Sequence, residues 1–354
     1  MSRLTRCTIG VVFAALALPG AAQAAARTVY MGPPPATQKS FDPTGSDVNA
    51  FFPKTVSIHK GDLVSFVAAG LHSLDMPVSG RPLQLFSPTG NKAQFTDAAG
   101  LPFWFSGQDE LGFTKGLLPP KFGRTVSKRN TRILSGVPFG ITPKPLKIRF
   151  AKAGNYKYYC NLHPGMDGTV KVRAKTRPVP SAKAVAATVK KQVASALTIA
   201  KSLVQNTAVP ANSVSVGAEG AQGVSYFGFL PENLTVAAGT TVRFFMPRRS
   251  TEEHTATFGP GSVDDKTSFM GALAASLEQP VADARAIYPS ELPGSPPAAL
   301  SPALHGDGFW NSGALDDVPP SPLPLDGTVT FAEAGTYPYV CLIHPFMKAT
   351  ITVQ

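Results

Sequence analysis

The 354-residue chain is long enough for two or three domains. Its 34 prolines, 32 glycines and only 16% charged residues favour a turn-rich β protein over a helical one. A hydrophobic share of 43% supports packed cores and argues against a wholly disordered chain. The formal net charge of +11 is uneven, because residues 27–175 carry 20 basic and 8 acidic side chains whereas residues 211–354 carry 6 and 14.

The first 26 residues have the layout of a secretory signal peptide. Arg3 and Arg6 precede a short apolar run, and small residues follow at Ala22, Ala24 and Ala26, as at a signal cleavage site. The apolar run is too short to span a bilayer, and no later stretch is long enough. We therefore expect an exported protein without a transmembrane segment, in the periplasm, the cell envelope or the extracellular space. An exported protein rarely meets nucleic acid, so we expect no nucleic-acid partner.

Two stretches predict paired strands at the start of each half. The sequence TVSIHKGDLVSFV follows Phe52-Pro53, and ENLTVAAGTTVRFF follows Leu230-Pro231. Each contains two alternating segments separated by a turn that begins with glycine, and this pattern predicts a β-hairpin in both halves. One histidine lies just beyond each predicted hairpin, at His72 and at His254.

An internal repeat is the strongest organisational signal in the chain. Residues 153–172 read AGNYKYYCNLHPGMDGTVKV and residues 334–353 read AGTYPYVCLIHPFMKATITV, with Ala-Gly, two aromatic residues, Cys, His-Pro and Met in common. The interval between each upstream histidine and its cysteine contains an aromatic motif, FWFSG at 103–107 and FWNSG at 309–313. We expect these aromatic residues to anchor the inserted segments in a core.

Residues 181–206, between the two halves, are predicted to form a helix. Ser181 is a candidate N-cap after Pro178 and Pro180. Apolar residues recur at three- and four-residue steps, at Val185, Val189, Val193, Leu197, Ala200 and Val204. We expect a connector packed along one domain, and the alternative is a helix through which two copies dimerise.

Each half offers one upstream histidine and one Cys-x-x-His-x-x-Met loop. A thiolate and two imidazoles in a plane, with a weak thioether on the axis, are the ligand set of a blue-copper site. Because side chains alternate along a strand, each cysteine shares a strand face with the tyrosine two residues before it. The candidate copper ligands are His72, Cys160, His163 and Met166 in the first half, and His254, Cys341, His344 and Met347 in the second.

On these motifs the sequence resembles the cupredoxin family, most closely the small amicyanin- and plastocyanin-like blue-copper proteins. The resemblance rests on Phe-Phe-Pro or Phe-Leu-Pro, the glycine-led turn, the upstream histidine and the short cysteine loop. It implies an all-β chain of two Greek-key β-sandwich domains with two type 1 coppers. The expected organisation is a signal peptide at 1–26, a first domain at 27–177, a helical linker at 178–209 and a second domain at 210–354.

The resemblance also carries expectations for individual residues. It implies that the downstream histidines, His163 and His344, lie near the surface and act as electron gateways. Family members often have asparagine directly after the first histidine, where it ties the two ligand loops together. This chain has Ser73 and Thr255 at those positions.

Two other uses of the same residues are open. Cys160 and Cys341 could form a disulfide in an oxidising compartment, provided that two strand-end cysteines from separate domains meet. Copper nitrite reductases and multicopper oxidases also contain cupredoxin domains. Beyond the four candidate histidine ligands, however, only His59 and His305 remain, which is too few for a trinuclear cluster. We therefore expect no enzyme activity.

The sequence as a whole predicts an exported blue-copper protein that carries electrons. The alternative is an envelope protein that binds or delivers copper without a redox-carrier role. The opposite charges of the two halves predict redox partner proteins of two kinds, an acidic partner for the basic first domain and a basic partner for the acidic second domain.

Overall fold

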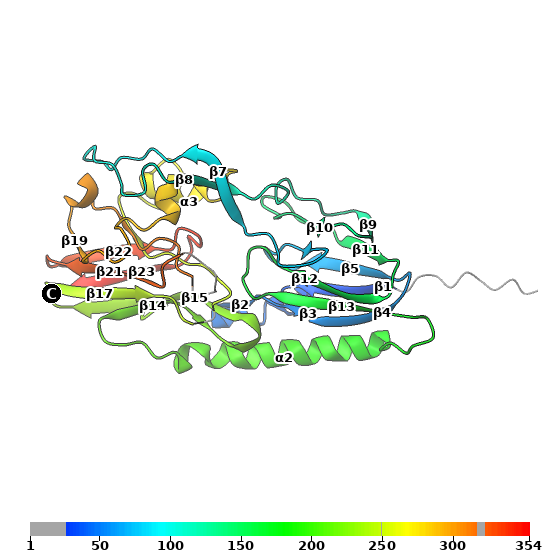
Figure 1. Ribbon diagram of the computed structural model, residues 1–354. Coiled ribbons are helices and arrows are strands. Elements are labelled where there is room, and N and C mark those ends of the chain that lie inside the picture. Colours follow the sequence, from blue (N-terminus) through cyan, green and yellow to red (C-terminus); the bar gives the residue numbers. More distant parts are fainter. Residues whose placement is uncertain (1–25, 249, 317–322) are drawn as a thin grey trace, which may run out of the picture.

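The computed structural model describes residues 26–248, 250–316 and 323–354, so residues 1–25 of the predicted signal peptide lie outside the described residues. The chain forms two β-sandwiches side by side, and one long helix, α2 (Ala182–Asn206), runs along both of them (Figure 1). Among the described residues, no helix combines the length and the apolar character needed to cross a membrane.

The first sandwich consists of two five-stranded sheets. One has the strand order β3-β1-β5-β11-β9, and the other has the order β10-β6-β12-β13-β4. Most neighbours are antiparallel, but three pairs are parallel: β1 with β5, β11 with β9 and β13 with β4. The strands are β1 (Ala26–Met31), β3 (Phe51–Phe52), β4 (Thr55–His59), β5 (Leu63–Ala68), β6 (Asp75–Met76), β9 (Thr125–Lys128), β10 (Ile133–Leu134), β11 (Leu146–Phe150), β12 (Gly154–Tyr159) and β13 (Asp167–Arg173).

The second sandwich repeats this arrangement. Its sheets have the orders β19-β21-β17-β14-β15-β2 and β16-β23-β22-β18-β20, again with parallel pairs, β14 with β17 and β16 with β23. The strands are β2 (Ser46–Val48), β14 (Ser213–Glu219), β15 (Val224–Leu230), β16 (Asn233–Val236), β17 (Thr240–Phe245), β18 (Thr257–Phe258), β19 (Ala298–Leu300), β20 (Trp310–Asn311), β21 (Asp326–Phe331), β22 (Gly335–Val340) and β23 (Lys348–Val353).

The two sandwiches correspond strand for strand, apart from β2. The predicted fold class, an all-β chain of β-sandwiches with a helical connector, is thus confirmed. Strand β2 belongs by sequence to the first half, yet it pairs with β15 of the second, with Val48 opposite Val224. A segment of the first half therefore extends a sheet of the second half and ties the two together.

The predicted β-hairpins are wrong in one respect. All four strands form, but β4 and β5 lie in opposite sheets of the first sandwich, and β16 and β17 lie in opposite sheets of the second. Their alternating burial means that each strand turns one face to the core. The turn at Gly61-Asp62 therefore passes from one sheet to the other instead of joining neighbours in a ladder. Alternation of apolar and polar residues predicts a half-buried strand, but it does not identify the strand with which that strand pairs.

The predicted helix is confirmed with its N-cap, because the Ser181 hydroxyl accepts a hydrogen bond from the Ala184 amide. Its buried residues, Val193, Ala196, Ala200 and Leu203, pack in one core with residues from both halves, Phe41, Val48, Phe52, Ala218 and Val224. The connector thus packs on both halves. Dimerisation through it stays a prediction.

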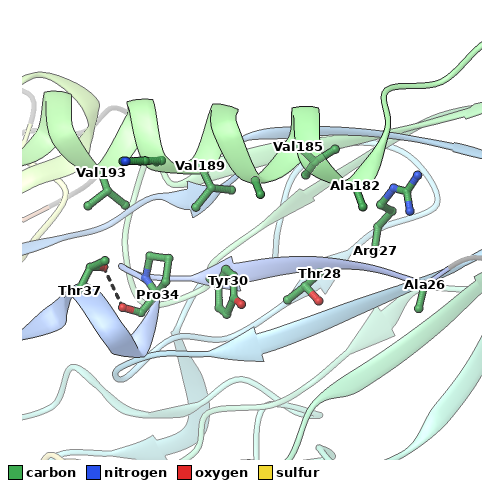
Figure 2. Close-up of a pocket in the computed structure, with 12 residues that line it drawn as sticks. Ala26, Arg27, Thr28, Tyr30, Pro34, Thr37, Ala182, Val185, Val189 and Val193 are labelled. Atoms are coloured by element: carbon green, nitrogen blue, oxygen red, sulfur yellow. Dashed lines mark hydrogen bonds between the residues drawn. The ribbon is translucent and has the colours of Figure 1, made fainter.

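The N-terminal part of α2 covers an apolar groove of about 430 Å³ against β1. Val185, Val189 and Val193 line its helix side, and Thr28 and Tyr30 line the strand side (Figure 2). None of the predicted copper ligands lines this groove.

The remaining elements belong mainly to inserted segments, which meet above the sandwiches (Figure 1). Their strands and helices are β7 (Phe86–Lys92), β8 (Asp109–Phe113), α3 (Phe269–Ser276) and α4 (Ala284–Ile287), while α1 (Pro35–Gln38) and the 3-10 turns η1 (Asp42–Thr44), η2 (Ala221–Gly223) and η3 (Leu304–Gly306) lie in connections. Phe103, Phe105 and Phe309 share one core, and the Trp104 indole donates to the Pro289 carbonyl at 2.9 Å. Phe103 and Phe309 thus anchor inserted segments in a core, as predicted, whereas Trp310 packs in the core of the second sandwich.

The two aromatic motifs are not counterparts in the fold. Trp310 and Asn311 form β20, and the strand in the same position of the first sandwich is β10 (Ile133–Leu134). The serine directly after each of these strands makes the same type of hydrogen bond. Ser135 Oγ accepts from the Leu74 backbone amide at 2.7 Å, and Ser312 Oγ accepts from the Ala256 backbone amide at 2.9 Å. FWFSG at 103–107 lies instead in the inserted segment.

Candidate metal centre

The first candidate site lies at one end of the first sandwich, where two loops meet. His72 lies between β5 and β6, Cys160 directly follows β12, and His163 lies in the loop to β13. The two histidine Nδ1 atoms are 2.9 Å apart, and Cys160 Sγ is 3.4 Å from Nδ1 of His163. All three side chains are buried.

The second candidate site has the same construction. His254 lies between β17 and β18, Cys341 follows β22, and His344 lies in the loop to β23. The Nδ1 atoms of the histidines are 3.1 Å apart, and Cys341 Sγ is 3.8 Å from His344 Nδ1 and 4.0 Å from His254 Nδ1. In each site one ligand atom per residue falls within 4.8 Å of the others.

A tight loop explains how seven consecutive residues return several donors to one point. The Cys160 amide donates to the Met166 carbonyl at 3.0 Å, and the Met166 amide donates to the His163 carbonyl at 3.1 Å. The corresponding bonds in the second loop measure 3.1 and 2.8 Å. Met166 and Met347 are buried in the same cores as their cysteines. Their role as axial ligands stays a prediction.

The hydroxyl groups of Ser73 and Thr255 tie the two ligand loops together. Ser73 Oγ accepts from the Asn161 amide at 2.8 Å, and Thr255 Oγ1 accepts from the Leu342 amide at 2.8 Å. The backbone amides of the same two residues donate to the sulfur atoms of Cys160 and Cys341, at 3.4 and 3.3 Å. A short hydroxyl side chain thus makes the cross-loop connection in this chain.

A glycine allows the backbone to pass directly behind each upstream histidine. Gly32 has a φ of +89°, and a Cβ there would lie 2.7 Å from His72 Nε2; Gly217 has a φ of +88°, and a Cβ there would lie 2.9 Å from His254 Nε2. Both Nε2 atoms are buried without a hydrogen-bond partner among the described residues. The sequence analysis missed both glycines because they lie 37 or more residues before the histidines they contact.

The donor set fits copper. In each group the two Nδ1 atoms and the sulfur face one another, which leaves a thiolate and two imidazoles to bind a single ion, the combination that suits Cu(I) and Cu(II) alike. Cys160 and Cys341 are both free, so the alternative disulfide is not formed.

The metal-free sites differ in charge. Burial raises the pKa of the Cys160 thiol, but the charge of His163 and its hydrogen bond outweigh burial and hold that pKa well below the usual value. Burial raises the pKa of Cys341, and backbone hydrogen bonds from Thr255 and His344 offset this only in part. Burial also lowers the pKa of His254, together with the neighbouring His344, to about 3. The first metal-free site therefore favours the thiolate form, which binds metals, more than the second site does.

The downstream histidines do not lie on an open surface, in contrast to what the resemblance implied. The side chains of His163 and His344 are 9% and 17% exposed and face each other across the junction of the two sandwiches. The Glu252 carboxylate lies between them, with Oε1 3.1 Å from His163 Nε2 and Oε2 3.5 Å from His344 Nε2. Glu252 of the second half covers the Nε2 edge of His163 in the first half.

The pKa of the Glu252 carboxyl is low in spite of its burial. Burial raises the pKa of its carboxyl, but His163 and then His344 and His254 outweigh burial and lower the pKa to about 2. Sequence reasoning missed Glu252, although a signal exists: it stands two residues before His254, where the first half has Gly70 two residues before His72. The position is a departure from the internal repeat.

Comparisons with known proteins give matches among solved structures only. No protein-family model and no curated protein matches the chain. The chain is similar to the reduced Cu(I) form of a mutant amicyanin at pH 4, with 18% identity over 43% of this chain and 90% of amicyanin, at a TM-score of 0.22. It is also similar to oxidized plastocyanin from Dryopteris crassirhizoma, with 21% identity over 40% of this chain and 99% of plastocyanin, at a TM-score of 0.20.

Proposed function

We propose that this chain is an exported electron-transfer protein with two type 1 copper sites, one in each of two cupredoxin-like domains at 27–177 and 210–354. One observation carries the proposal: two separate His-Cys-His groups converge, each beside a Cys-x-x-His-x-x-Met loop. Bound copper would supply a one-electron Cu(II)/Cu(I) couple, for which mixed sulfur and imidazole donors are suited. The proposed axial ligands are Met166 and Met347.

Preorganisation of the ligands favours an electron carrier over a copper-delivery protein. Loop hydrogen bonds, the hydroxyls of Ser73 and Thr255, and the backbone behind His72 and His254 hold the donors in place. A ligand set held by such a shell changes little when the charge of the metal changes. Delivery requires ligands that can reach a recipient, and Cys160 and Cys341 are 4% and 0% exposed.

The proposed partners are redox proteins of opposite charge. The excess of basic side chains in residues 27–175 favours an acidic partner, and the excess of acidic ones in residues 211–354 favours a basic partner. We propose that the protein meets them outside the cytoplasm.

Copper loading of residues 27–354 tests this function. We expect two coppers per chain and an intense blue thiolate-to-copper absorption band. The Cys160→Ala and Cys341→Ala variants should each retain one copper and part of the band, and the double variant should lose both. Reversible one-electron oxidation of both sites supports the carrier. Colourless copper that a chelator removes readily would instead indicate copper delivery.

A further inference from the structure

A single side chain contacts a ligand of each candidate site. His163 and His344 both turn Nδ1 toward their own cysteine and Nε2 toward the junction of the sandwiches. Both Nε2 atoms lie next to the Glu252 carboxylate. His163 Nε2 is 3.1 Å from Oε1, and His344 Nε2 is 3.5 Å from Oε2. The side chain of Glu252 is 7% exposed, so water competes little for these contacts.

The chemistry of these contacts is specific. A carboxylate oxygen faces each Nε2, so an imidazole that binds a metal through Nδ1 can present its Nε2–H to Glu252. Histidine ligands of metals commonly donate their second N–H to a carboxylate, which fixes the ring and strengthens the ligand. Here the Glu252 carboxylate contacts two imidazole rings, His163 in the first candidate site and His344 in the second.

The two carboxylate oxygens are not equivalent. Asn49 Nδ2 donates to Oε1 at 2.8 Å, the oxygen that also contacts His163, whereas Oε2 contacts His344. Asn49 is held in turn by the hydroxyls of Ser225 and Thr251, at 3.2 and 3.1 Å. This network fixes which oxygen faces which site.

We propose that Glu252 is a shared positioning residue that couples the two copper sites, so that they act as one two-site unit. This inference rests on the proposed function. With copper in both sites, His163, Glu252 and His344 would provide a path for one electron from Cu(I) in one site to Cu(II) in the other. Both Nε2 protons would stay on their imidazoles, so no proton would be released. The bridge replaces the open histidine edge through which a separate partner would otherwise be reached.

The asymmetry of Glu252 gives a sharp test with single-site proteins. Cys341→Ala leaves only the first site, and Cys160→Ala leaves only the second. In the E252Q variant the amide oxygen should stay beside Asn49 and His163, and the amide NH₂ should face His344, from which it cannot accept a hydrogen bond. We expect E252Q to weaken copper binding about 10- to 100-fold in the second site only, and E252A to weaken both sites.

Competition with a chelator measures the copper affinities of the single-site proteins. Electron exchange between the two sites is measured in the two-site protein, after flash photoreduction with one electron equivalent. We expect E252A to slow that exchange at least about tenfold, since the bridge is gone. The matched control is D97N, which removes another buried carboxylate that contacts a histidine of the other half, His305, away from both sites. D97N should change neither affinity nor exchange.

Two results overturn the inference. One is that E252Q and E252A have equal copper affinities in both single-site proteins, and the other is that E252A leaves the rate of electron exchange unchanged. Failure of the proposed function looks different, because copper would then bind to neither single-site protein. In that case the bridge is judged in the metal-free protein from ring ¹⁵N spectra of His163 and His344. If the bridge exists, the Nε2–H protons of both histidines exchange with solvent faster in E252A than in the parent protein. Equal rates of proton exchange would show that the bridge is absent.

Discussion

At the scale of single residues, small side chains and glycines shape both candidate sites. Ser73 and Thr255 reach across from one ligand loop to the other through a hydroxyl group. Gly32 and Gly217 let a strand pass behind the upstream histidines, in a left-handed conformation that other residues adopt only with strain. The candidate ligands are thus positioned by residues that lie outside the two His-Cys-His groups.

The Ser73→Ala variant tests the cross-loop connection. Without the hydroxyl, the buried Asn161 amide loses its acceptor, and we expect the free energy of unfolding of the metal-free protein to fall by about 1–3 kcal/mol. Urea unfolding measures the change. Ser202→Ala is the control: its hydroxyl lies on the exposed face of α2 and should cost less than about 0.5 kcal/mol. Equal stability of Ser73→Ala and the parent would contradict the role.

The Gly32→Ala variant tests the space behind His72. The new Cβ would lie 2.4 Å from the Ala69 carbonyl oxygen and 2.7 Å from His72 Nε2, so the imidazole must move. We expect copper stoichiometry to fall from two to one per chain, with the second site intact. Gly61→Ala provides the matched control, because Gly61 also has a positive φ, of +96°, but its Cβ would meet nothing within 4 Å. That control should lose stability and keep both coppers.

At the scale of elements, helix α2 and strand β2 join the two sandwiches. The helix buries Leu203 and Ala200 against Val48 and Phe52 of the first half and Val224 of the second. Strand β2 adds to the sheet of the second sandwich. Because Glu252 and His163 come from different halves, the bridge between the sites depends on this packing.

The Leu203→Ala variant measures how much the helix holds the halves together. Truncation of a buried leucine leaves a cavity, and we expect a loss of about 2–5 kcal/mol in the free energy of unfolding. Thr198→Ala, on the exposed face of the same helix, should have little effect. Thermal or urea unfolding compares the two. If the helix were loosely attached, the two variants would have the same stability.

At the scale of the whole molecule, the inserted segments form a second connection between the halves. His305 of the second half lies between two carboxylates, with Nδ1 3.3 Å from Asp97 of the first half and Nε2 2.9 Å from Glu291. Burial lowers the pKa of His305, but the hydrogen bonds and charges of Glu291 and Asp97 outweigh it, so the pKa is raised. This contact therefore depends on the proton that His305 carries.

The raised pKa of His305 predicts a pH dependence of stability. The protonated histidine contributes stability that is fully present below its unfolded pKa of about 6.5 and is lost as the pH rises through its higher folded pKa. We expect the parent protein to lose stability relative to His305→Gln over that range. Unfolding free energies measured from pH 6 to 9 give the difference. Parallel curves for the two proteins would show that His305 does not contribute.

Much of each site can be predicted from sequence, because its chemistry is local. Cys160 and His163, like Cys341 and His344, lie three residues apart at the end of a strand, and backbone geometry alone brings them together. The upstream histidines, His72 and His254, were found because the same pattern occurs twice. The strands themselves followed from alternation of buried and exposed residues.

The sequence by itself determined the β class and the connecting helix, because their periods are local, and it indicated the two candidate ligand groups, because the pattern of histidine and cysteine loop occurs twice. Only the tertiary structure decided which strands pair, that β2 crosses to the second half, and that Glu252 lies between His163 and His344. Those facts depend on which surfaces of the two halves meet. Glu252 lies 89 positions after His163 and 92 positions before His344. Contacts over such separations follow from the packing of the sandwiches, and no short-range sequence pattern predicts them.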